Sequence, residues 1–219
     1  MRKAILFDLD GTLLDTLDDL ADSLNYALTA MNCPTHTREK VCSFIGNGAS
    51  KLVERAMPEG ASADDLAQCL LTFQGKYREN LDNKTRPYDG VMDMLHTLKA
   101  QGIRMGVVSN KFDAAVAPLC QKHFPNLFDV AIGENESAGL RRKPAPDMVD
   151  EALRRMNVDA NGAIYVGDSP VDIKTASASN LPAILVCWGF SPRAQLVEAG
   201  AQYIIDEAAQ FIPLFEGLQ

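Results

Sequence analysis

The segment AILFDLDGT, residues 4–12, joins a short apolar run to two acidic residues that follow it directly. The run Ala4–Phe7 has the length and composition of a buried strand, and Asp8 and Asp10 come at its carboxyl end. Residues two apart in an extended chain point the same way, and Gly11 allows a sharp turn. Ligand sites in open α/β sheets lie beyond the carboxyl ends of the strands, so both carboxylates are predicted to face a site. Taken alone, the pair is equally compatible with a helix cap or a solvated turn.

Similar apolar runs recur along the chain, with amphipathic stretches between them. The predicted strands are Ala4–Phe7, Ile103–Val108, Val130–Ile132, Ala163–Val166, Ala183–Cys187 and Tyr203–Ile205. The predicted helices are Gly90–Ala100, Asp113–His123, Ala145–Met156, Val171–Ser179 and Ser191–Ala199. Strands that alternate with helices predict an α/β fold, a doubly wound parallel sheet with helices on both faces.

One interval, residues 15–85, breaks this alternation because it shows only helical periodicity. We expect it to form an inserted, all-helical cap domain. The α/β catalytic core then consists of residues 1–14 and 86–219, and the breaker-rich stretch NKTRPYDG, residues 83–90, returns the chain to it.

Composition excludes several classes of function. The chain has 219 residues, 47% of them hydrophobic, and a formal net charge of −8, so it lacks the basic excess that binding to nucleic acid requires. Its acidic balance repels anions at long range, and any phosphate must therefore be captured by local cations, backbone amides or a metal.

Cysteine usage and hydropathy predict a cytoplasmic enzyme that is not bound to a membrane. The 5 cysteines are widely spaced without a C-x-x-C pair, which is typical of reduced thiols. The apolar run near Met1 is too short for a signal peptide, and no run approaches the roughly 20 residues of a membrane span.

Two further polar signals follow predicted strands. Ser109 and Asn110 come after Ile103–Val108, where a hydroxyl and backbone amides can hold phosphate oxygens, although such residues are also ordinary turn chemistry. Lys143 provides a compact positive charge whose place is set by Pro144, and without context a solvated basic patch explains it as well.

The stretch GDSPVD, residues 167–172, is a further signal at a strand end. Asp168 can ligate a hard cation and Asp172 can support it from the next turn. Mg²⁺ prefers oxygen ligands and needs only one or two carboxylates beside a substrate phosphate. The alternative is a helix capped by Asp168 or Ser169.

Together these signals form the ordered set D-x-D-G-T, Ser, Lys and G-D-x-x-x-D, with a helical insert after the first. This set resembles the haloacid dehalogenase superfamily over nearly the whole chain. The resemblance implies that Asp8 is the nucleophile, which becomes an aspartyl phosphate, and that Asp10 is the general acid and base. It implies Mg²⁺ as cofactor, held by Asp8, the Asp10 carbonyl and Asp168, with Asp172 in support. The implied phosphate-binding and orienting residues are Thr12, Ser109, Asn110 and Lys143.

Within the superfamily, dehalogenases lack an acid at the position of Asp10, so phosphoryl chemistry is favoured here. The loop IGNGA, residues 45–49, resembles the phosphoglycolate phosphatase branch, and this implies that Asn47 and Gly48 bind the substrate carboxylate. A plain helix–helix turn remains the alternative for that loop. The acidic stretch 134–140 and the SPV filling of the last motif depart from the branch and leave the substrate open.

The predicted substrate is a small phosphorylated metabolite, foremost 2-phosphoglycolate, and the expected assembly is a monomer or homodimer. A phosphosugar mutase, a pyrophosphatase and a nucleotidase of the same superfamily remain alternatives. From another class, a phospho-aspartate signalling module shares the aspartate at the sheet end, but such modules are shorter and lack a helical insert.

Overall fold

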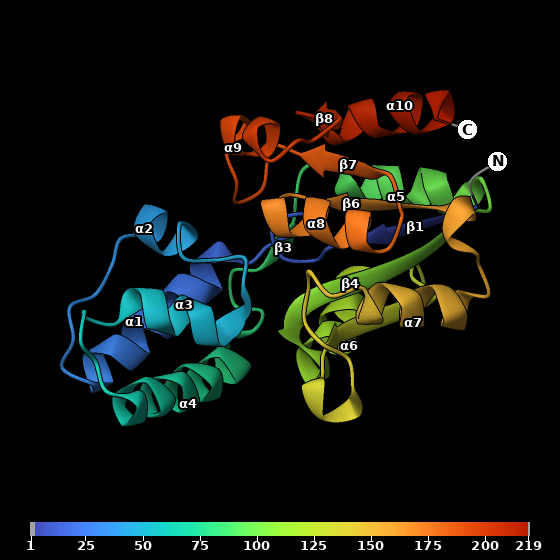
Figure 1. Ribbon diagram of the computed structural model, residues 1–219. Helices are drawn as coiled ribbons and strands as arrows, with labels where there is room; N and C mark the ends of the chain where they lie inside the picture. Colours follow the sequence, from blue (N-terminus) through green and yellow to red (C-terminus); the bar gives the residue numbers. More distant parts are fainter. Residues whose placement is uncertain (1–2, 219) are drawn as a thin grey trace. The chain divides into compact units, whose positions relative to one another are not determined.

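Six parallel strands form the central sheet of the structure, a computed structural model that describes residues 3–218 (Figure 1). In spatial order they are β5 (Val130–Glu134), β4 (Arg104–Phe112), β1 (Ala4–Phe7), β6 (Ala163–Gly167), β7 (Ala183–Val186) and β8 (Tyr203–Ile205). All the predicted strands are confirmed, and so is the doubly wound α/β class. Because β1 lies inside the sheet between β4 and β6, the residues that follow it come out near the middle of the sheet edge.

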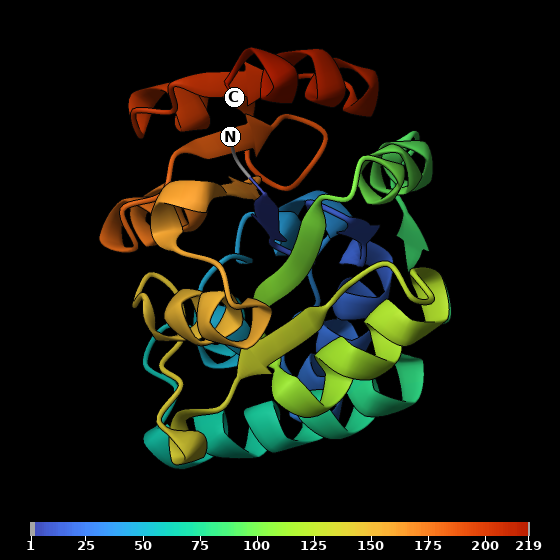
Figure 2. The ribbon, with the colours of Figure 1, turned by 90° about the vertical axis from the view of Figure 1, so that its right-hand side faces the viewer.

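Helices cover both faces of the sheet. In Figure 2, α7 (Asp147–Met156) and α8 (Pro170–Ala178) lie on one side of the strands, and α5 (Val91–Ala100) and α6 (Asp113–His123) lie on the other. The chain ends with α9 (Arg193–Glu198) and α10 (Phe211–Gly217), of which the second was not expected from the sequence. Short 3₁₀ turns occur at Glu136–Ala138, Ala160–Gly162 and Ala208–Gln210.

The composition of β1 follows from this double cover. Leu6 belongs to an apolar cluster with Met148 and other α7 side chains. On the opposite face, the ring of Phe7 lies 6.1 Å, between centroids, from each of the rings of Phe128 and Phe211. A strand that is buried on both faces has no polar alternation, which explains why its sequence is uninterruptedly apolar.

The end of β4 differs from the prediction. The strand was expected to stop at Val108, but it continues to Phe112 through an irregularity. Val108 is paired with Ile132 and Phe112 with Glu134, so the β4 segment is longer than the β5 segment it accompanies. Pairing with β5 resumes beyond Ser109, and therefore the polar residues lie within a bulged strand and not after its end.

A helical unit spans Thr16–Arg86 and is separate from the core unit, which comprises the chain up to Asp15 and from Pro87 onward. Its helices are α1 (Leu17–Ala30), α2 (Arg38–Cys42), α3 (Gly48–Ala56) and α4 (Ala63–Asn80). The long helices α1 and α4 pack together, and α4 begins with a capping box between Ser62 and Asp65.

The linkers between the units are short strands, β2 (Leu14–Asp15) and β3 (Arg86–Pro87), which pair as a two-stranded sheet. Inside the helical unit, the carboxylate of Asp19 on α1 is buried and accepts hydrogen bonds from the backbone N–H groups of Lys84 and Thr85. The beginning and the end of this unit are therefore held together by a charged acceptor. Among residues 3–218, no helix combines the length and the apolar character that crossing a membrane requires.

Candidate active site

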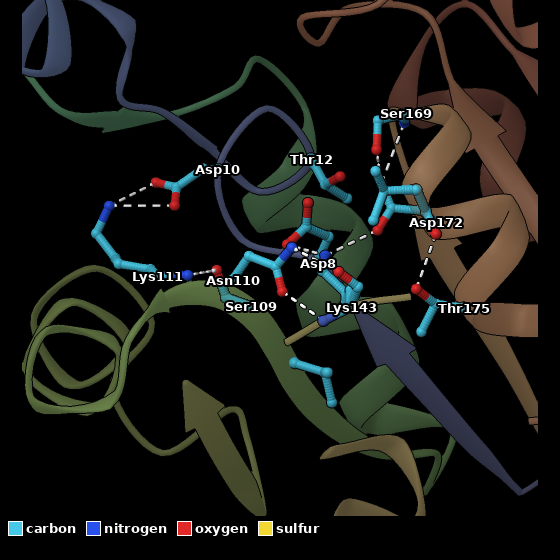
Figure 3. A network of polar contacts seen from close by, with 12 residues as sticks. Asp8, Asp10, Thr12, Ser109, Asn110, Lys111, Lys143, Ser169, Asp172 and Thr175 are labelled. Carbon is cyan, nitrogen blue, oxygen red and sulfur yellow. Dashed lines mark hydrogen bonds and ion pairs between the residues drawn. The ribbon is translucent and has the colours of Figure 1, made fainter. Parts of the chain in front are cut away.

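The polar residues predicted from the sequence within the core unit gather at the carboxyl edge of its sheet (Figure 3). Asp8 follows β1, Asp168 follows β6, and Asp172 lies in the first turn of α8. Lys143 comes from the segment between β5 and α7. All four side chains are buried, with residue exposures between 0% and 7%. Buried charges require close partners, and the geometry shows what these partners are.

Lys143 lies at the centre of the cluster. Its Nζ is 2.8 Å from Oδ1 of Asp8 and 2.8 Å from Oδ1 of Asp172. It also lies 3.3 Å from the hydroxyl of Tyr165, which in turn is 3.3 Å from the Val108 carbonyl oxygen. One ammonium therefore links the candidate nucleophile on β1 to the helix that follows β6.

Asp168 is fixed from two directions. Its Oδ2 accepts a 2.7 Å hydrogen bond from the backbone N–H of Phe190, and its Oδ1 accepts one of 3.2 Å from the Thr12 hydroxyl. The backbone approaches closely here, since a Cβ on Gly11 would lie 2.5 Å from Oδ2 of Asp168. Gly11 also has φ +90°, so both its conformation and its surroundings call for glycine.

Asp172 caps the N-terminus of α8 together with Ser169. Its Oδ2 accepts hydrogen bonds from the backbone N–H groups of Asp168 and Ser169 and a 2.6 Å bond from the Ser169 hydroxyl. Ser169 and Asp172 thus form a capping box, with Pro170 at the first helical position. The prediction of a helix cap in the GDSPVD stretch is confirmed with Ser169 as the capping residue, and the other oxygen of Asp172 contacts Lys143.

We expect Gly167→Ala to disturb this arrangement. A Cβ at Gly167 would lie 2.3 Å from both Cβ and Cγ of Asp172, so the buried carboxylate has to shift. The expected loss is about 1–3 kcal/mol of unfolding free energy, measured by urea denaturation. The matched control is Gly75→Ala in α4, where nothing lies within 4 Å of the added Cβ and a gain of up to about 1 kcal/mol is expected. Equal effects of the two substitutions would contradict the prediction.

Burial and charge shift the pKa values in the cluster. Burial raises the pKa of Asp8 to about 7, although Lys143 opposes the shift, and burial together with the neighbouring Asp172 raises the pKa of Asp168 well above its usual range. Burial lowers the pKa of Lys143, but the carboxylates of Asp172 and Asp8 outweigh it and hold that pKa well above its ordinary value. The lysine therefore stays charged, while the carboxyl groups of Asp8 and Asp168 bind protons more readily than ordinary carboxyl groups.

Asn110 positions the backbone of Lys143. The N–H of Lys143 donates a 2.6 Å hydrogen bond to Oδ1 of Asn110, and Nδ2 of Asn110 donates one of 3.2 Å to the Lys143 carbonyl oxygen. Ser109 is buried beside it and accepts a hydrogen bond from the backbone N–H of Lys111. The side chain of Asn110 is thus occupied with orienting the lysine, a role that the sequence did not indicate.

Asp10 has a partner that sequence reasoning missed. Its carboxylate points away from Asp8 in Figure 3 and toward Lys111, whose Nζ lies 2.8 Å from Oδ1 and 3.1 Å from Oδ2. Lys111 directly follows the predicted residues Ser109 and Asn110, but it was not itself predicted as a site residue. Tyr165 was likewise missed, because a tyrosine in an apolar strand carries no signal that distinguishes it from a core residue.

Three carboxylates of the cluster could hold a metal ion. Asp8, Asp168 and Asp172 each present an oxygen, and these oxygens lie within 4.8 Å of one another. One ammonium faces three carboxylates, which leaves an excess of two negative charges when all are ionised. Buried oxygen donors with that excess fit a hard divalent cation.

The predicted residues Asn47 and Gly48 belong to the helical unit. Gly48 is the first residue of α3 and has φ +82°, and Asn47 precedes it. Oδ1 of Asn47 accepts a 2.6 Å hydrogen bond from Nη2 of Arg55. The side chain of Asn47 is therefore held by Arg55, a residue of the same unit.

Comparison with known proteins decides the family. Residues 5–186 match the family described as haloacid dehalogenase-like hydrolase. The chain belongs to this family. The matched range begins in β1 and ends in β7, so it includes every site residue that was predicted from the sequence.

Relatives of this hydrolase extend over nearly its whole length. The phosphoglycolate phosphatase of Mesorhizobium japonicum is 34% identical over 88% of this chain and 86% of its own length. That of Haemophilus influenzae is 32% identical over 97% of both chains. The crystal structure of a candidate phosphoglycolate phosphatase from Lactobacillus delbrueckii subsp. bulgaricus superposes with a TM-score of 0.91 at 35% identity, covering 96% of this chain and 97% of that one. The hydrolase is accordingly a phosphoric monoester hydrolase of the haloacid dehalogenase type.

Proposed function

We propose that the hydrolase is a Mg²⁺-dependent phosphatase that cleaves 2-phosphoglycolate through a phosphorylated Asp8. The observation that carries this proposal is the buried cluster in which Nζ of Lys143 contacts Asp8 and Asp172, both at 2.8 Å, next to Asp168. A carboxylate nucleophile needs an adjacent positive charge before it can approach a phosphate, and this cluster provides both.

The magnesium ion would be held by Asp8, Asp168 and the Asp10 carbonyl, with Asp172 in support. When bound, it supplies positive charge that draws the phosphate toward Asp8 and offsets the developing charge. A carboxylate about 4 Å from one negative charge of the phosphate is repelled by roughly 4 kcal/mol at an effective dielectric constant of about 20. Lys143 contributes to the same compensation, together with the Ser109 hydroxyl and the backbone N–H of Asn110, which would bind phosphoryl oxygens.

The residues divide the reaction between them. In the first step an oxygen of Asp8 forms a bond to phosphorus while the bond to the ester oxygen breaks, and Asp10 gives its proton to the departing alkoxide. In the second step Asp10 takes a proton from water, whose oxygen attacks phosphorus as the Asp8–phosphorus bond breaks. Free phosphate leaves, and Asp8 and Asp10 are returned to their starting states. Thr12 supports the site through its hydrogen bond to Asp168.

Substrate choice is proposed to reside in the helical unit, acting as a cap domain formed by residues 15–85. The backbone amides at the start of α3, with Asn47 and Gly48, would bind the carboxylate of the substrate, because a helix N-terminus carries partial positive charge. The names of the two curated relatives support phosphoglycolate as the substrate. Asn47→Ala is the corresponding variant, and it should raise the KM for phosphoglycolate more than the KM for p-nitrophenyl phosphate.

The test of the proposed function is phosphate release from a panel of esters with and without Mg²⁺. The panel contains phosphoglycolate, hexose phosphates, nucleotides, pyrophosphate and p-nitrophenyl phosphate. Release that requires Mg²⁺ and is fastest for phosphoglycolate is expected. Isomerisation of a hexose phosphate without release would identify a mutase instead, and release from none of the esters would contradict the proposal.

Magnesium should stabilise the fold more strongly at high pH. Because the pKa of Asp8 is raised from 3.8 to about 7, the folded protein binds more protons than the unfolded protein between these values. The stability of the metal-free protein therefore falls as the pH rises through this window. A cation competes with the protons, so the increase in melting temperature caused by Mg²⁺ should be larger at about pH 8 than at about pH 5.

Differential scanning calorimetry with Mg²⁺ or with EDTA provides the measurement. Asp168→Asn is the control, because it removes one candidate ligand and should reduce the increase at the higher pH. An increase of the same size at both pH values would contradict the assignment of the cation to these carboxylates.

We further propose that the hydrolase works in the cytoplasm on a small phosphorylated metabolite, as a monomer or homodimer and without nucleic acid or membrane partners. All 5 cysteines are free thiols, which supports a reducing compartment.

A further inference from the structure

Lys111 is a buried charge that the reaction described above does not use. Its side chain is only 3% exposed, and its Nζ contacts both carboxylate oxygens of Asp10, at 2.8 Å and 3.1 Å. Burying an ammonium is costly unless it has a partner. The contact with Asp10 is therefore a buried ion pair that the fold maintains, unlike a solvent-exposed ion pair, which contributes little.

The backbone places Lys111 there through the irregularity in β4. β1 and β4 are neighbours in the sheet, with Phe7 paired to Val107, so the residues that follow each strand meet beyond its end. Asn110 and Lys111 lie in the irregular segment between Val108 and Phe112, and as successive residues of an extended chain they point in different directions. Asn110 then reaches Lys143 and Lys111 reaches Asp10.

The bulge itself is rigidly supported by β5. Gly133 lies so close that a Cβ there would be 2.6 Å from the Lys111 carbonyl oxygen and 2.4 Å from Cα of Asp113. The N–H of Gly133 donates a 2.9 Å hydrogen bond to Oδ1 of Asp113. The backbone that carries Lys111 is therefore closely packed against β5.

From this geometry we infer that Lys111 is a positioning residue for Asp10, directing its carboxylate through two hydrogen bonds. This inference rests on the proposed phosphatase function, in which Asp10 protonates the leaving alkoxide and later activates water. A freely rotating carboxylate spends little time aligned with the ester oxygen, whereas one held by a fixed ammonium samples few directions. Lys111 acts on the reaction only through Asp10 and does not contact the phosphoryl group.

The leaving group provides the test. An alkyl phosphate needs a proton on its departing oxygen, whereas p-nitrophenolate leaves without one. Lys111→Met should therefore slow phosphoryl transfer from 2-phosphoglycolate by about 10²-fold, as expected for the loss of aligned acid catalysis. Single-turnover release of p-nitrophenolate should change by less than about threefold. Because water attack still needs Asp10, the variant should show a burst of p-nitrophenolate followed by slow turnover.

Two further variants separate positioning from a structural role. In an Asp10→Asn background, Lys111→Met should cause no further loss beyond about twofold, because residues that act as a unit are non-additive. This double variant lacks both charges of the pair, so it does not leave an unpaired buried charge if the single variant folds poorly. Lys122→Met, at an exposed position on α6, is the matched control and should leave both reactions unchanged.

An equal loss with both substrates in Lys111→Met, or a full additional loss in the Asp10→Asn background, would overturn the inference. These outcomes differ from failure of the proposed function, in which the wild-type protein itself releases phosphate from none of the esters. If the wild type prefers another alkyl ester, that ester replaces phosphoglycolate in the same comparison.

Discussion

Asp8→Asn is expected to abolish phosphate release, with a fall in kcat of about 10⁴-fold or more. The amide cannot form the bond to phosphorus that we propose for the carboxylate, and the substitution removes one oxygen of the candidate metal cluster. Steady-state release from the best ester, at saturating Mg²⁺, is the measurement.

The same variant should fold as well as the wild type. Burial raises the pKa of Asp8, which shows that its charge is unfavourable in the metal-free fold, and an amide of the same size removes that charge. Lys143 keeps its contact with Asp172. A melting temperature in EDTA that is no lower than that of the wild type is therefore expected near pH 8. Retained turnover in Asp8→Asn would contradict the role of Asp8, since its fold is expected to be intact.

Lys143→Met is expected to have the largest effect on stability, a loss of about 3–5 kcal/mol of unfolding free energy at neutral pH. The substitution leaves Asp8 and Asp172 buried without the ammonium that contacts both at 2.8 Å. It also removes the ammonium that we propose binds the phosphate, so activity should fall with stability. Urea denaturation in EDTA measures the first effect and phosphate release the second.

The pH dependence distinguishes this explanation from simple loss of packing. Because Lys143 lowers the pKa of Asp8, its removal lets the pKa rise further. The folded variant then holds protons that the unfolded chain has released, and its stability deficit should grow as the pH rises from about 5 to about 8. A deficit that is constant with pH would point to packing instead. Lys122→Met, on the surface of the same unit, should change stability by less than about 0.5 kcal/mol.

Much of the core could be predicted from short segments. Ala4–Phe7 is apolar throughout because both of its faces are covered, and this property is visible in a few consecutive residues. Its sharp ending at Asp8 marks the carboxyl edge of the sheet. In a parallel sheet all such edges lie together, so Asp8 and Asp168 could be expected near one another before any coordinates were known.

The partners of these residues could not be predicted in the same way. Lys111 lies in the irregular segment of β4, and its contact with Asp10 joins two residues that are 101 positions apart in the chain. One carboxylate oxygen of Asp172 caps α8 and the other contacts Lys143. This division depends on the direction in which α8 follows β6.

The sequence by itself determined the α/β class, the order of the strands along the chain and which side chains reach the edge of the sheet, because periodicity and strand ends are local properties. Only the tertiary structure decided which buried charge faces which. Those pairings depend on the relative placement of segments such as β4 and β5 to within a few tenths of an ångström. The residues adjacent to each charge in the sequence do not determine that placement.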